Sequence, residues 1–234
     1  MTFFEDVGSV ALMARIARVV IPGIPHHLTQ RGNRRMQTFF RDDDYREYIA
    51  LIADSCRRYE VDVWAYCLMP NHVHFIAVPM QPDSFRHAMG EAHRRYTRHV
   101  NFREKWRGHL WQERFASYPM GENHLLAAAR YIELNPVRAG LAREPWSYKW
   151  SSAGAHMRGA DDELVRVGPL LGMVNDWRDF IREDITGKEM ERFRQHERTG
   201  RPMGDMDFIE GIEKACCRVL QPRKPGPKKK ETNN

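Results

Sequence analysis

The chain has 234 residues and a hydrophobic content of 42%, enough for one domain of ordinary size with an appendage. No apolar run approaches the ~20 residues of a membrane span, and the four cysteines form no C-x-x-C pair, so we expect neither a membrane segment nor a structural zinc site. The net charge of +6 indicates a polyanionic partner, and nucleic acid is the first candidate.

The first half of the chain predicts three strands and one helix. Residues 26–31 form a plausible first strand. Apolar residues then recur at helical spacing over 45–56, which predicts a helix. Residues 61–68 are rich in β-branched and aromatic side chains, and a tight Pro-Asn turn joins them to a third apolar run at 72–78. We therefore expect the second and third strands to pair antiparallel.

The following residues predict a helix, a strand and another helix. An apolar stripe at helical spacing covers 84–100, a β-rich run covers 110–118, and a helix runs from 124 to 135, where Pro136 ends or kinks it. The order strand, helix, strand, strand, helix, strand is the ferredoxin-like split βαβ arrangement. We predict an α+β fold, a ferredoxin-like antiparallel sheet with helices on one face, whose first and third strands are central.

The predicted third strand contains a His-Val-His sequence. Residues two apart on a strand face the same side, about 6–7 Å apart, so His72 and His74 present two imidazoles together while Val73 faces the other side. Such a pair suits a divalent metal with open positions for substrate. Taken alone, it is more simply explained as two ordinary histidines. We interpret His26 and His27 as packing or surface residues, because nothing in the sequence places them beside His72.

Tyr131 and Asn135 lie four residues apart on the predicted helix before Pro136, so they project from one side of it. If this helix packs beneath the histidine strand, Asn135 could supply an oxygen ligand to Mg²⁺ or Mn²⁺ and Tyr131 could lie beside the ion. A tyrosine so placed can attack a phosphate and form a covalent phosphotyrosine. Each residue also has a simpler explanation, Tyr131 as a core aromatic and Asn135 as a helix-terminal residue.

Four motifs occur in one order along the chain. They are Met-Pro-Asn-His-Val-His at 69–74, Leu-Trp-Gln-Glu-Arg-Phe at 110–115, Tyr-Ile-Glu-Leu-Asn-Pro-Val-Arg-Ala-Gly-Leu at 131–141 and Trp-Ser-Ser-Ala at 150–153. This set resembles the single-tyrosine HUH transposases, and within them it is most similar to the REP-associated tyrosine transposases. The resemblance covers residues 13–154. The full set is far more specific than the His-Val-His pair.

The resemblance implies the HUH endonuclease fold and a DNA transposase, a metal-dependent endonuclease and strand transferase that acts on single-stranded DNA with hairpin or palindromic elements. His72, His74 and Asn135 would bind Mg²⁺ or Mn²⁺, and Tyr131 would be the nucleophile that forms a 5′-phosphotyrosine and frees a 3′-OH. We expect no small-molecule cofactor, no membrane partner, and a monomer or homodimer in the bacterial cytoplasm, associated with the nucleoid. The alternative is a non-catalytic hairpin-DNA-binding protein derived from such a transposase.

The predicted domain organisation has four parts. We expect an N-terminal extension at 1–12, a catalytic domain at 13–154, a helical C-terminal extension at 155–221 and a basic disordered tail at 222–234.

Basic residues in several segments are candidate DNA contacts, although a solvated surface or a solubilising tail would explain them as well. The candidates are Arg34, Arg35, Arg94, Arg98, Arg114, Arg201, Arg223, Lys224 and Lys228.

Overall fold

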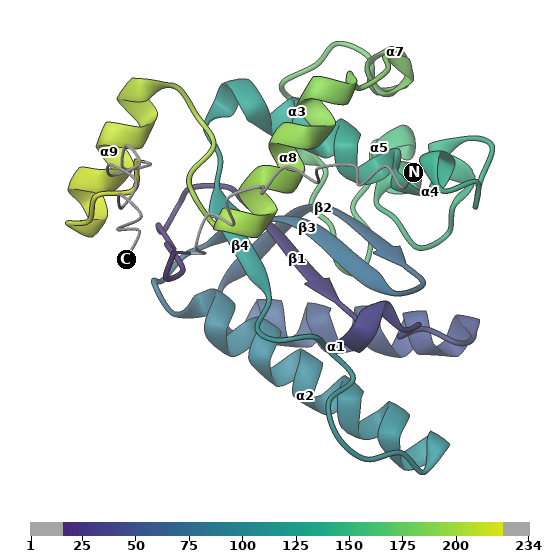
Figure 1. The fold of residues 1–234 in the computed structure, drawn as a ribbon. Helices are drawn as coiled ribbons and strands as arrows, with labels where there is room; N and C mark the ends of the chain where they lie inside the picture. The colour runs from purple at the N-terminus through teal and green to yellow at the C-terminus, as the bar shows by residue number, and fades with distance from the viewer. Residues whose placement is uncertain (1–15, 222–234) are drawn as a thin grey trace, which may run out of the picture.

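The computed structural model describes residues 16–221 and is built on one four-stranded antiparallel sheet (Figure 1). The strands are β1 (His26–Arg31), β2 (Val61–Met69), β3 (His72–Pro79) and β4 (Ala116–Pro119), in the order β2-β3-β1-β4. The first and third strands are therefore central, as predicted. β2 and β3 pair antiparallel, which confirms the predicted hairpin.

Helices cover both faces of the sheet. α1 (Asp42–Arg58) and α2 (Ser84–Glu104) lie side by side on one face, and α3 (Glu122–Glu133) and α8 (Gly187–Thr199) lie on the other (Figure 1). The first pair completes the predicted ferredoxin-like arrangement with its helices on one face. The opposite face is covered by elements that follow β4 in the chain.

Alternation along β3 supplies apolar side chains to both layers. Val73 and Phe75 are buried in one hydrophobic cluster with side chains of α1 and α2. Ile76 is buried in a second cluster with side chains of α3 and α8. His74 shares the Ile76 side of the strand, because the two are two residues apart. The sheet thus separates two hydrophobic cores, and the face of β3 that carries His74 lies on the side of α3 and α8.

The remaining helices are short. They are η1 (Asn33–Arg35), α4 (Asn135–Arg138), η2 (Pro145–Ser147), α5 (Ala153–Arg158), α6 (Gly168–Leu171), α7 (Trp177–Arg182) and α9 (Met206–Cys216). Pro136 lies in the first turn of α4. The helix predicted to run to residue 135 ends at Glu133, so Asn135 begins α4 and is not on the helix that carries Tyr131. Over residues 16–221, no helix combines the length and the apolar character that crossing a membrane requires.

The predicted strand 110–118 is wrong in its first part, because β4 begins only at Ala116. Just before that point the chain still runs beside the end of β1, where Gln30 Nε2 donates to the Gln112 carbonyl at 2.9 Å. Glu113 then adopts a left-handed conformation with φ of 54°. Such a conformation turns the backbone out of strand geometry, so the β-rich composition of this segment serves core packing instead.

Residues after 154 pack into both cores. Leu164 and Val165 join the cluster next to α1 and α2. Trp177 and Phe193 join the cluster beneath α3. The division of the chain into a catalytic domain and an extension at 154 stays a prediction.

Glu133, at the end of α3, ties three helical segments together. Its fully buried carboxylate accepts hydrogen bonds from Ser152 Oγ at 2.5 Å, His156 Nδ1 at 2.7 Å and Trp177 Nε1 at 3.1 Å. A buried carboxylate is stable only when its oxygens are paired in this way. The network therefore fixes α5 and α7 against the helix that carries Tyr131.

We expect Glu133→Gln to lower the free energy of unfolding by about 1–3 kcal/mol, because the new amide N–H₂ would face one of the three donors and leave it unpaired. Urea denaturation followed by circular dichroism measures the change. Glu144→Gln, at an exposed position, is the matched control and should change the free energy of unfolding by less than about 0.5 kcal/mol. Equal effects of the two substitutions would contradict the role of the network.

Candidate active site

His72 and His74 project from the same face of β3, as predicted, with ring centroids 5.0 Å apart. The Nδ1 atom of each ring has a hydrogen-bond partner, Asn71 Oδ1 at 2.6 Å for His72 and His27 Nε2 at 3.0 Å for His74. Neither Nε2 atom has a hydrogen-bond partner within residues 16–221. Histidine ligands of metals are usually held through the ring nitrogen that does not bind the metal. The two Nε2 atoms are therefore the ones suited to a metal.

The tautomer of His72 follows from its neighbours. Asn71 Nδ2 donates to the Arg35 carbonyl at 3.0 Å, which orients the amide so that its oxygen faces His72. An amide oxygen only accepts, so His72 Nδ1 carries the proton and Nε2 keeps a lone pair. Burial, reinforced by the charge of Arg31, lowers the pKa of His72 to about 4. At neutral pH the ring is uncharged, which is the form that binds metals.

His27 belongs to this cluster, and the prediction that nothing places it with the histidine pair is wrong. It is buried, as a packing residue should be, but it contacts His74 directly. For His74 to keep a lone pair on Nε2, its Nδ1 has to donate to His27. His27 Nδ1 then donates to the Tyr118 hydroxyl oxygen, which lies 2.7 Å away. Burial lowers the pKa of His27 to about 3, so this ring is also neutral.

Tyr131 faces the histidines from α3. Its ring centroid is 5.8 Å from that of His74 and 6.0 Å from that of His27. Only 7% of the residue is exposed, and Phe193 of α8 stacks on its ring at 4.8 Å. Burial raises the pKa of the phenol to about 12, and the charge of Glu197 adds to this effect. The phenol is protonated at neutral pH and has to lose its proton to act as a nucleophile.

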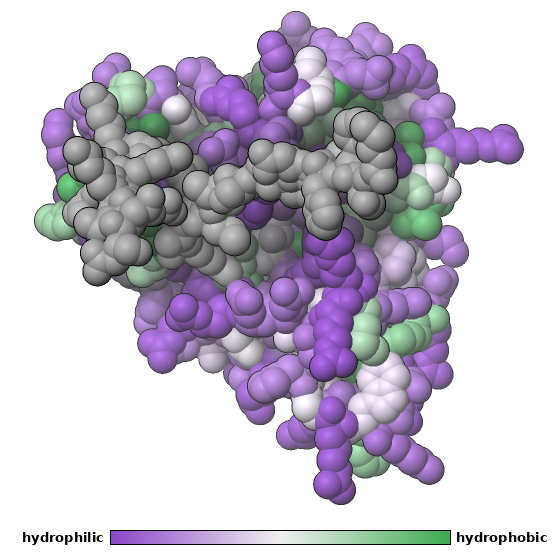
Figure 2. Space-filling view, viewed as in Figure 1, coloured by the Kyte–Doolittle hydropathy of each residue, from purple (hydrophilic) through white to green (hydrophobic). Residues whose placement is uncertain are grey.

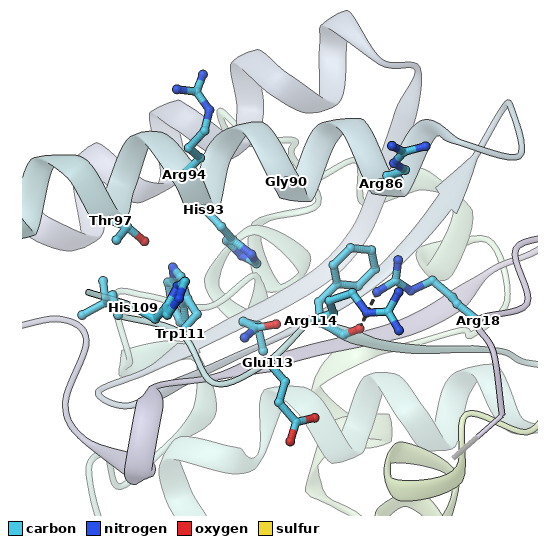
Figure 3. Close-up of a pocket in the computed structure, with 13 residues that line it drawn as sticks. Arg18, Arg86, Gly90, His93, Arg94, Thr97, His109, Trp111, Glu113 and Arg114 are labelled. Atoms are coloured by element: carbon cyan, nitrogen blue, oxygen red, sulfur yellow. Dashed lines mark hydrogen bonds between the residues drawn. The ribbon is translucent and has the colours of Figure 1, made fainter. Parts of the chain in front are cut away.

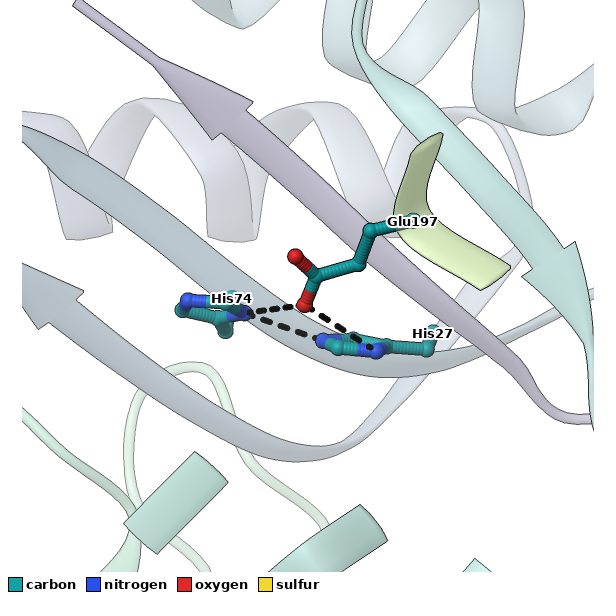
Figure 4. A group of neighbouring side chains, drawn as sticks. All are labelled: His27, His74 and Glu197. Atoms are coloured by element: carbon teal, nitrogen blue, oxygen red, sulfur yellow. Dashed lines mark hydrogen bonds and ion pairs between the residues drawn. The ribbon is translucent and has the colours of Figure 1, made fainter. Parts of the chain in front are cut away.

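Glu197 of α8 reaches the same place, and the sequence analysis missed it. Its Oε1 lies 3.8 Å from His74 Nδ1 and 3.9 Å from His27 Nδ1 (Figure 4). Burial raises the pKa of Glu197 to about 7, and the nearby Tyr131 hydroxyl acts in the opposite direction. The Oε1 atom of Glu197 is buried without a hydrogen-bond partner among the described residues. The sequence offers one weak signal, the four-residue spacing from Phe193 on a helix whose other residues are mostly exposed.

Two sets of side chains could hold a cation. His27, His74 and Glu197 have ligand atoms within 4.8 Å of one another. In this set, however, the two histidines use their facing nitrogens to bond each other, and the carboxylate lies over the rings (Figure 4). A histidine binds a metal through a lone pair in the plane of its ring. The Nε2 atoms of His72 and His74 keep such a lone pair free of hydrogen bonds among the described residues. That these two atoms and Asn135 form one metal site stays a prediction.

Asn135 begins α4 and is linked to Tyr131 through Arg138. The Arg138 Nη2 atom donates to Asn135 Oδ1 at 2.9 Å and to the Tyr131 carbonyl at 2.6 Å, and the guanidinium lies 4.8 Å from the centre of the Tyr131 ring. The Asn135 oxygen has a second lone pair for another partner. Its Nδ2 is buried without a partner in the described part of the chain. The structure thus brings His72, His74 and Tyr131 together and attaches Asn135 to the tyrosine.

Cationic side chains surround the cluster. Arg31 pairs with His72 across the two central strands. Arg31, Arg35 and Arg198 line one hollow together with Glu197. Guanidinium groups bind phosphate oxygens with paired, charge-assisted hydrogen bonds. The cluster therefore combines a potential nucleophile, potential metal ligands and groups that attract a phosphate.

The basic residues predicted to contact DNA lie on several surfaces. Those exposed are Arg34, Arg35, Arg94, Arg98 and Arg114. Figure 2 shows mostly hydrophilic side chains over the part of the surface where α2 lies. Arg201 is half-buried, and its guanidinium donates to the Leu220 carbonyl. Arg223, Lys224 and Lys228 lie outside the described residues. DNA contact by all of these residues stays a prediction.

Comparisons with known proteins found one matching family and two solved structures of similar proteins. Residues 22–135 match the family described as IS200-like transposases. A solved structure of a REP-associated tyrosine transposase bound to a REP hairpin is similar over 75% of this chain and 100% of its own, with a TM-score of 0.54 and 21% identity. A putative transposase from Deinococcus radiodurans R1 matches 51% of this chain and 95% of its own, with a TM-score of 0.37 and 21% identity. No curated protein matches the sequence.

Burial of neutral histidines makes stability depend on pH. Burial lowers the pKa of His93, on α2, from 6.5 to about 3. Below pH 6.5 the unfolded chain binds a proton that the folded protein excludes, so the free energy of unfolding falls as the pH is lowered. We expect urea denaturation at a series of pH values below 7 to show this fall, and His93→Gln to reduce proton uptake on unfolding by about one. His99→Gln, at an exposed position on α2, is the matched control, and an equal change in both variants would contradict burial as the cause.

Proposed function

We propose that this chain, whose residues 22–135 match the IS200-like transposase family, cuts and joins single-stranded DNA at hairpins through a covalent tyrosine intermediate. The observation that carries the proposal is the position of Tyr131, whose ring lies 5.8 Å from that of His74. A tyrosine, a neutral histidine pair and arginines around one point are the groups needed for metal-assisted transfer of a DNA strand.

Tyr131 would act as the nucleophile. Its oxygen attacks the DNA phosphorus, and the bond from phosphorus to the 3′-oxygen breaks. The products are a 5′-phosphotyrosine and, once the leaving oxygen takes up a proton, a free 3′-OH. The group placed to receive the phenol proton is Glu197, whose carboxylate lies near the Tyr131 hydroxyl. Because the phosphotyrosine keeps the energy of the broken bond, another 3′-OH can attack it and rejoin strands without ATP.

His72, His74 and Asn135 would hold a Mg²⁺ or Mn²⁺ ion. Both histidines fit this role, since burial lowers their pKa values and each is held through Nδ1. The amide oxygen of Asn135 is a ligand that both ions accept. A bound ion would polarise the phosphate and offset the charge that develops on its oxygens.

A DNA hairpin is the partner that we propose. The structure of similar fold contains a REP hairpin, and this chain has a net charge of +6. Arg35 lies beside the histidine strand, since its carbonyl accepts a hydrogen bond from Asn71. The single-stranded segment would meet Arg31 and Arg35 near Tyr131, and the exposed arginines farther away would contact the phosphates of the stem.

One observation favours a second function, hairpin binding without catalysis. Only 7% of Tyr131 is exposed, Phe193 of α8 stacks on its ring, and burial raises the pKa of its phenol to about 12. A protein in which this phenol stays protonated would bind hairpins through its arginines and leave the DNA intact. Formation of a covalent adduct separates the two functions.

The decisive experiment mixes the purified protein with labelled single-stranded hairpins from the DNA that flanks its gene, with Mg²⁺ or Mn²⁺ or with a chelator. We expect a metal-dependent, protein-sized labelled band on a denaturing gel. Tyr131→Phe should bind the hairpins nearly normally and give no band, because only the attacking oxygen is lost. Tyr118→Phe, from the same cluster, is the matched control and should keep the band.

Two outcomes would contradict the proposed chemistry. In the first, the unmodified protein binds several hairpins tightly but gives neither adduct nor cleavage. This result would reject catalysis and support hairpin binding alone. Cleavage by Tyr131→Phe at the full rate would mean that water is the nucleophile.

Metal binding can be measured apart from activity by titrating the protein with Mn²⁺ and following free Mn²⁺ by electron paramagnetic resonance. We expect His72→Ala and Asn135→Ala each to weaken binding at least about tenfold, because each removes a ligand. Glu197→Gln should leave the affinity nearly unchanged. The opposite pattern, loss with Glu197→Gln and none with His72→Ala, would assign the ion to His27, His74 and Glu197 instead.

A further inference from the structure

Arg138 of α4 is a charged side chain in direct contact with Tyr131. Its Nη2 atom donates to the Tyr131 carbonyl at 2.6 Å and to Asn135 Oδ1 at 2.9 Å. The guanidinium carbon lies 4.8 Å from the centre of the Tyr131 ring. Burial raises the pKa of the phenol, and the charge of Arg138 acts in the opposite direction, as expected for a cation beside that ring. The chemistry proposed above gives this charge no role.

Most of the hydrogen-bonding capacity of Arg138 is unused. A guanidinium has five N–H donors, and the two bonds to Tyr131 and Asn135 both use Nη2. The donors on Nε and Nη1 form no hydrogen bond or ion pair with any described residue, and the side chain is exposed. The two acceptors hold the guanidinium in place, so its free donors are oriented before a ligand arrives.

Other arginines are less well placed beside Tyr131. Arg86 lies on α2, at the cavity that α2 forms with residues 109–115 (Figure 3), and α2 covers the face of the sheet away from α3. Arg194 of α8 has a charge that, like that of Arg138, opposes the effect of burial on the pKa of the Tyr131 phenol. Arg194 is exposed, and no hydrogen bond to a described residue fixes its guanidinium. Arg138 differs from both because it is hydrogen-bonded to the helix that carries Tyr131.

The proposed reaction creates charge next to this guanidinium. As the Tyr131 oxygen bonds to phosphorus and the bond from phosphorus to the 3′-oxygen breaks, negative charge grows on the non-bridging oxygens of the phosphate. N–H donors that are already oriented stabilise such charge. The guanidinium stays protonated at neutral pH, so Arg138 would donate hydrogen bonds and transfer no proton.

We propose that Arg138 binds the phosphate that Tyr131 attacks, through the N–H groups on Nε and Nη1, and stabilises the charge on its non-bridging oxygens. The inference rests on the proposed DNA function and adds a residue that contacts the substrate. Arg138 keeps its bonds to the Tyr131 carbonyl and to Asn135 in this role. One side chain would therefore align the phosphate with the helix that carries the nucleophile.

The first test measures DNA binding in the Tyr131→Phe background, where the DNA stays intact. The probes are hairpins with single-stranded extensions in which one phosphate at a time is replaced by a neutral methylphosphonate. Fluorescence anisotropy gives the Kd of each probe for the parent protein and for Arg138→Gln. A phosphate bound by Arg138 is recognised as the position where neutralisation costs affinity only while the arginine is present.

We expect neutralisation at one position to weaken binding about tenfold in the parent and less than about twofold in Arg138→Gln, the effect of one charge-assisted hydrogen bond. Arg138→Lys keeps the charge and should keep part of the effect. Arg143→Gln, an exposed change in the loop after α4, is the matched control and should keep all of it. Loss of the effect in Arg194→Gln but not in Arg138→Gln would assign the phosphate to α8 and overturn the inference.

The second test separates phosphate binding from a purely positioning role. With Tyr131 intact, Arg138→Gln should slow formation of the covalent adduct at least about a hundredfold, the cost of one lost donor to the transition state. The same variant should not weaken Mn²⁺ binding, because Arg138 is not a metal ligand. A loss of Mn²⁺ affinity as large as the loss of adduct would mean that Arg138 only positions Asn135, which overturns the inference.

The two tests keep this inference separate from the proposed function. Equal effects of neutralisation in the parent and in Arg138→Gln at every position would overturn the inference, and so would an Arg138-dependent phosphate other than the one that is cleaved. An adduct at Tyr131 without any Arg138-dependent phosphate rejects the role of Arg138 alone. An Arg138-dependent phosphate without an adduct supports the phosphate contact and rejects the catalytic proposal alone.

Discussion

The alternation of side chains along β3 is the constraint on which the rest of the structure depends. Val73 and Phe75 enter the core beneath α1 and α2 and anchor the strand. His72 and His74 are thereby held on the opposite face, on a central strand that is bonded on both sides. A slip of one residue in register would exchange the two faces and place the histidines in the apolar core. The residues that stabilise the sheet therefore also fix the position of the candidate site.

Hydrogen bonds behind the histidines decide what the two rings can do. Asn71 and His27 occupy the Nδ1 atoms, and both partners belong to elements that the sheet already fixes, the β2–β3 turn and β1. Burial removes the positive charge, and these bonds orient the rings. The two effects together direct a lone pair of His72 away from the strand. Two exposed histidines at the same spacing would have neither property, because water would protonate and rotate them.

Residues after 154 contribute to the candidate site through α8. Phe193 stacks on the ring of Tyr131, and the Glu197 carboxylate lies near its hydroxyl. Burial in this position raises the pKa of Tyr131. A helix far along the chain thus sets the surroundings of the phenol and supplies the carboxylate that would receive its proton.

The sequence by itself determined the ferredoxin-like arrangement, the central place of β1 and β3 and the shared face of His72 and His74, because each depends on local periodicity and on the order of elements. The sequence analysis misplaced the start of β4, because the pattern of apolar residues does not show where a residue adopts the left-handed backbone conformation. Only the tertiary structure decided that His27 contacts His74 and that Glu197 reaches Tyr131. Those contacts join residues far apart in the chain. They depend on cross-strand register and on the docking of α8, which the packing of the whole chain sets and local spacing does not encode.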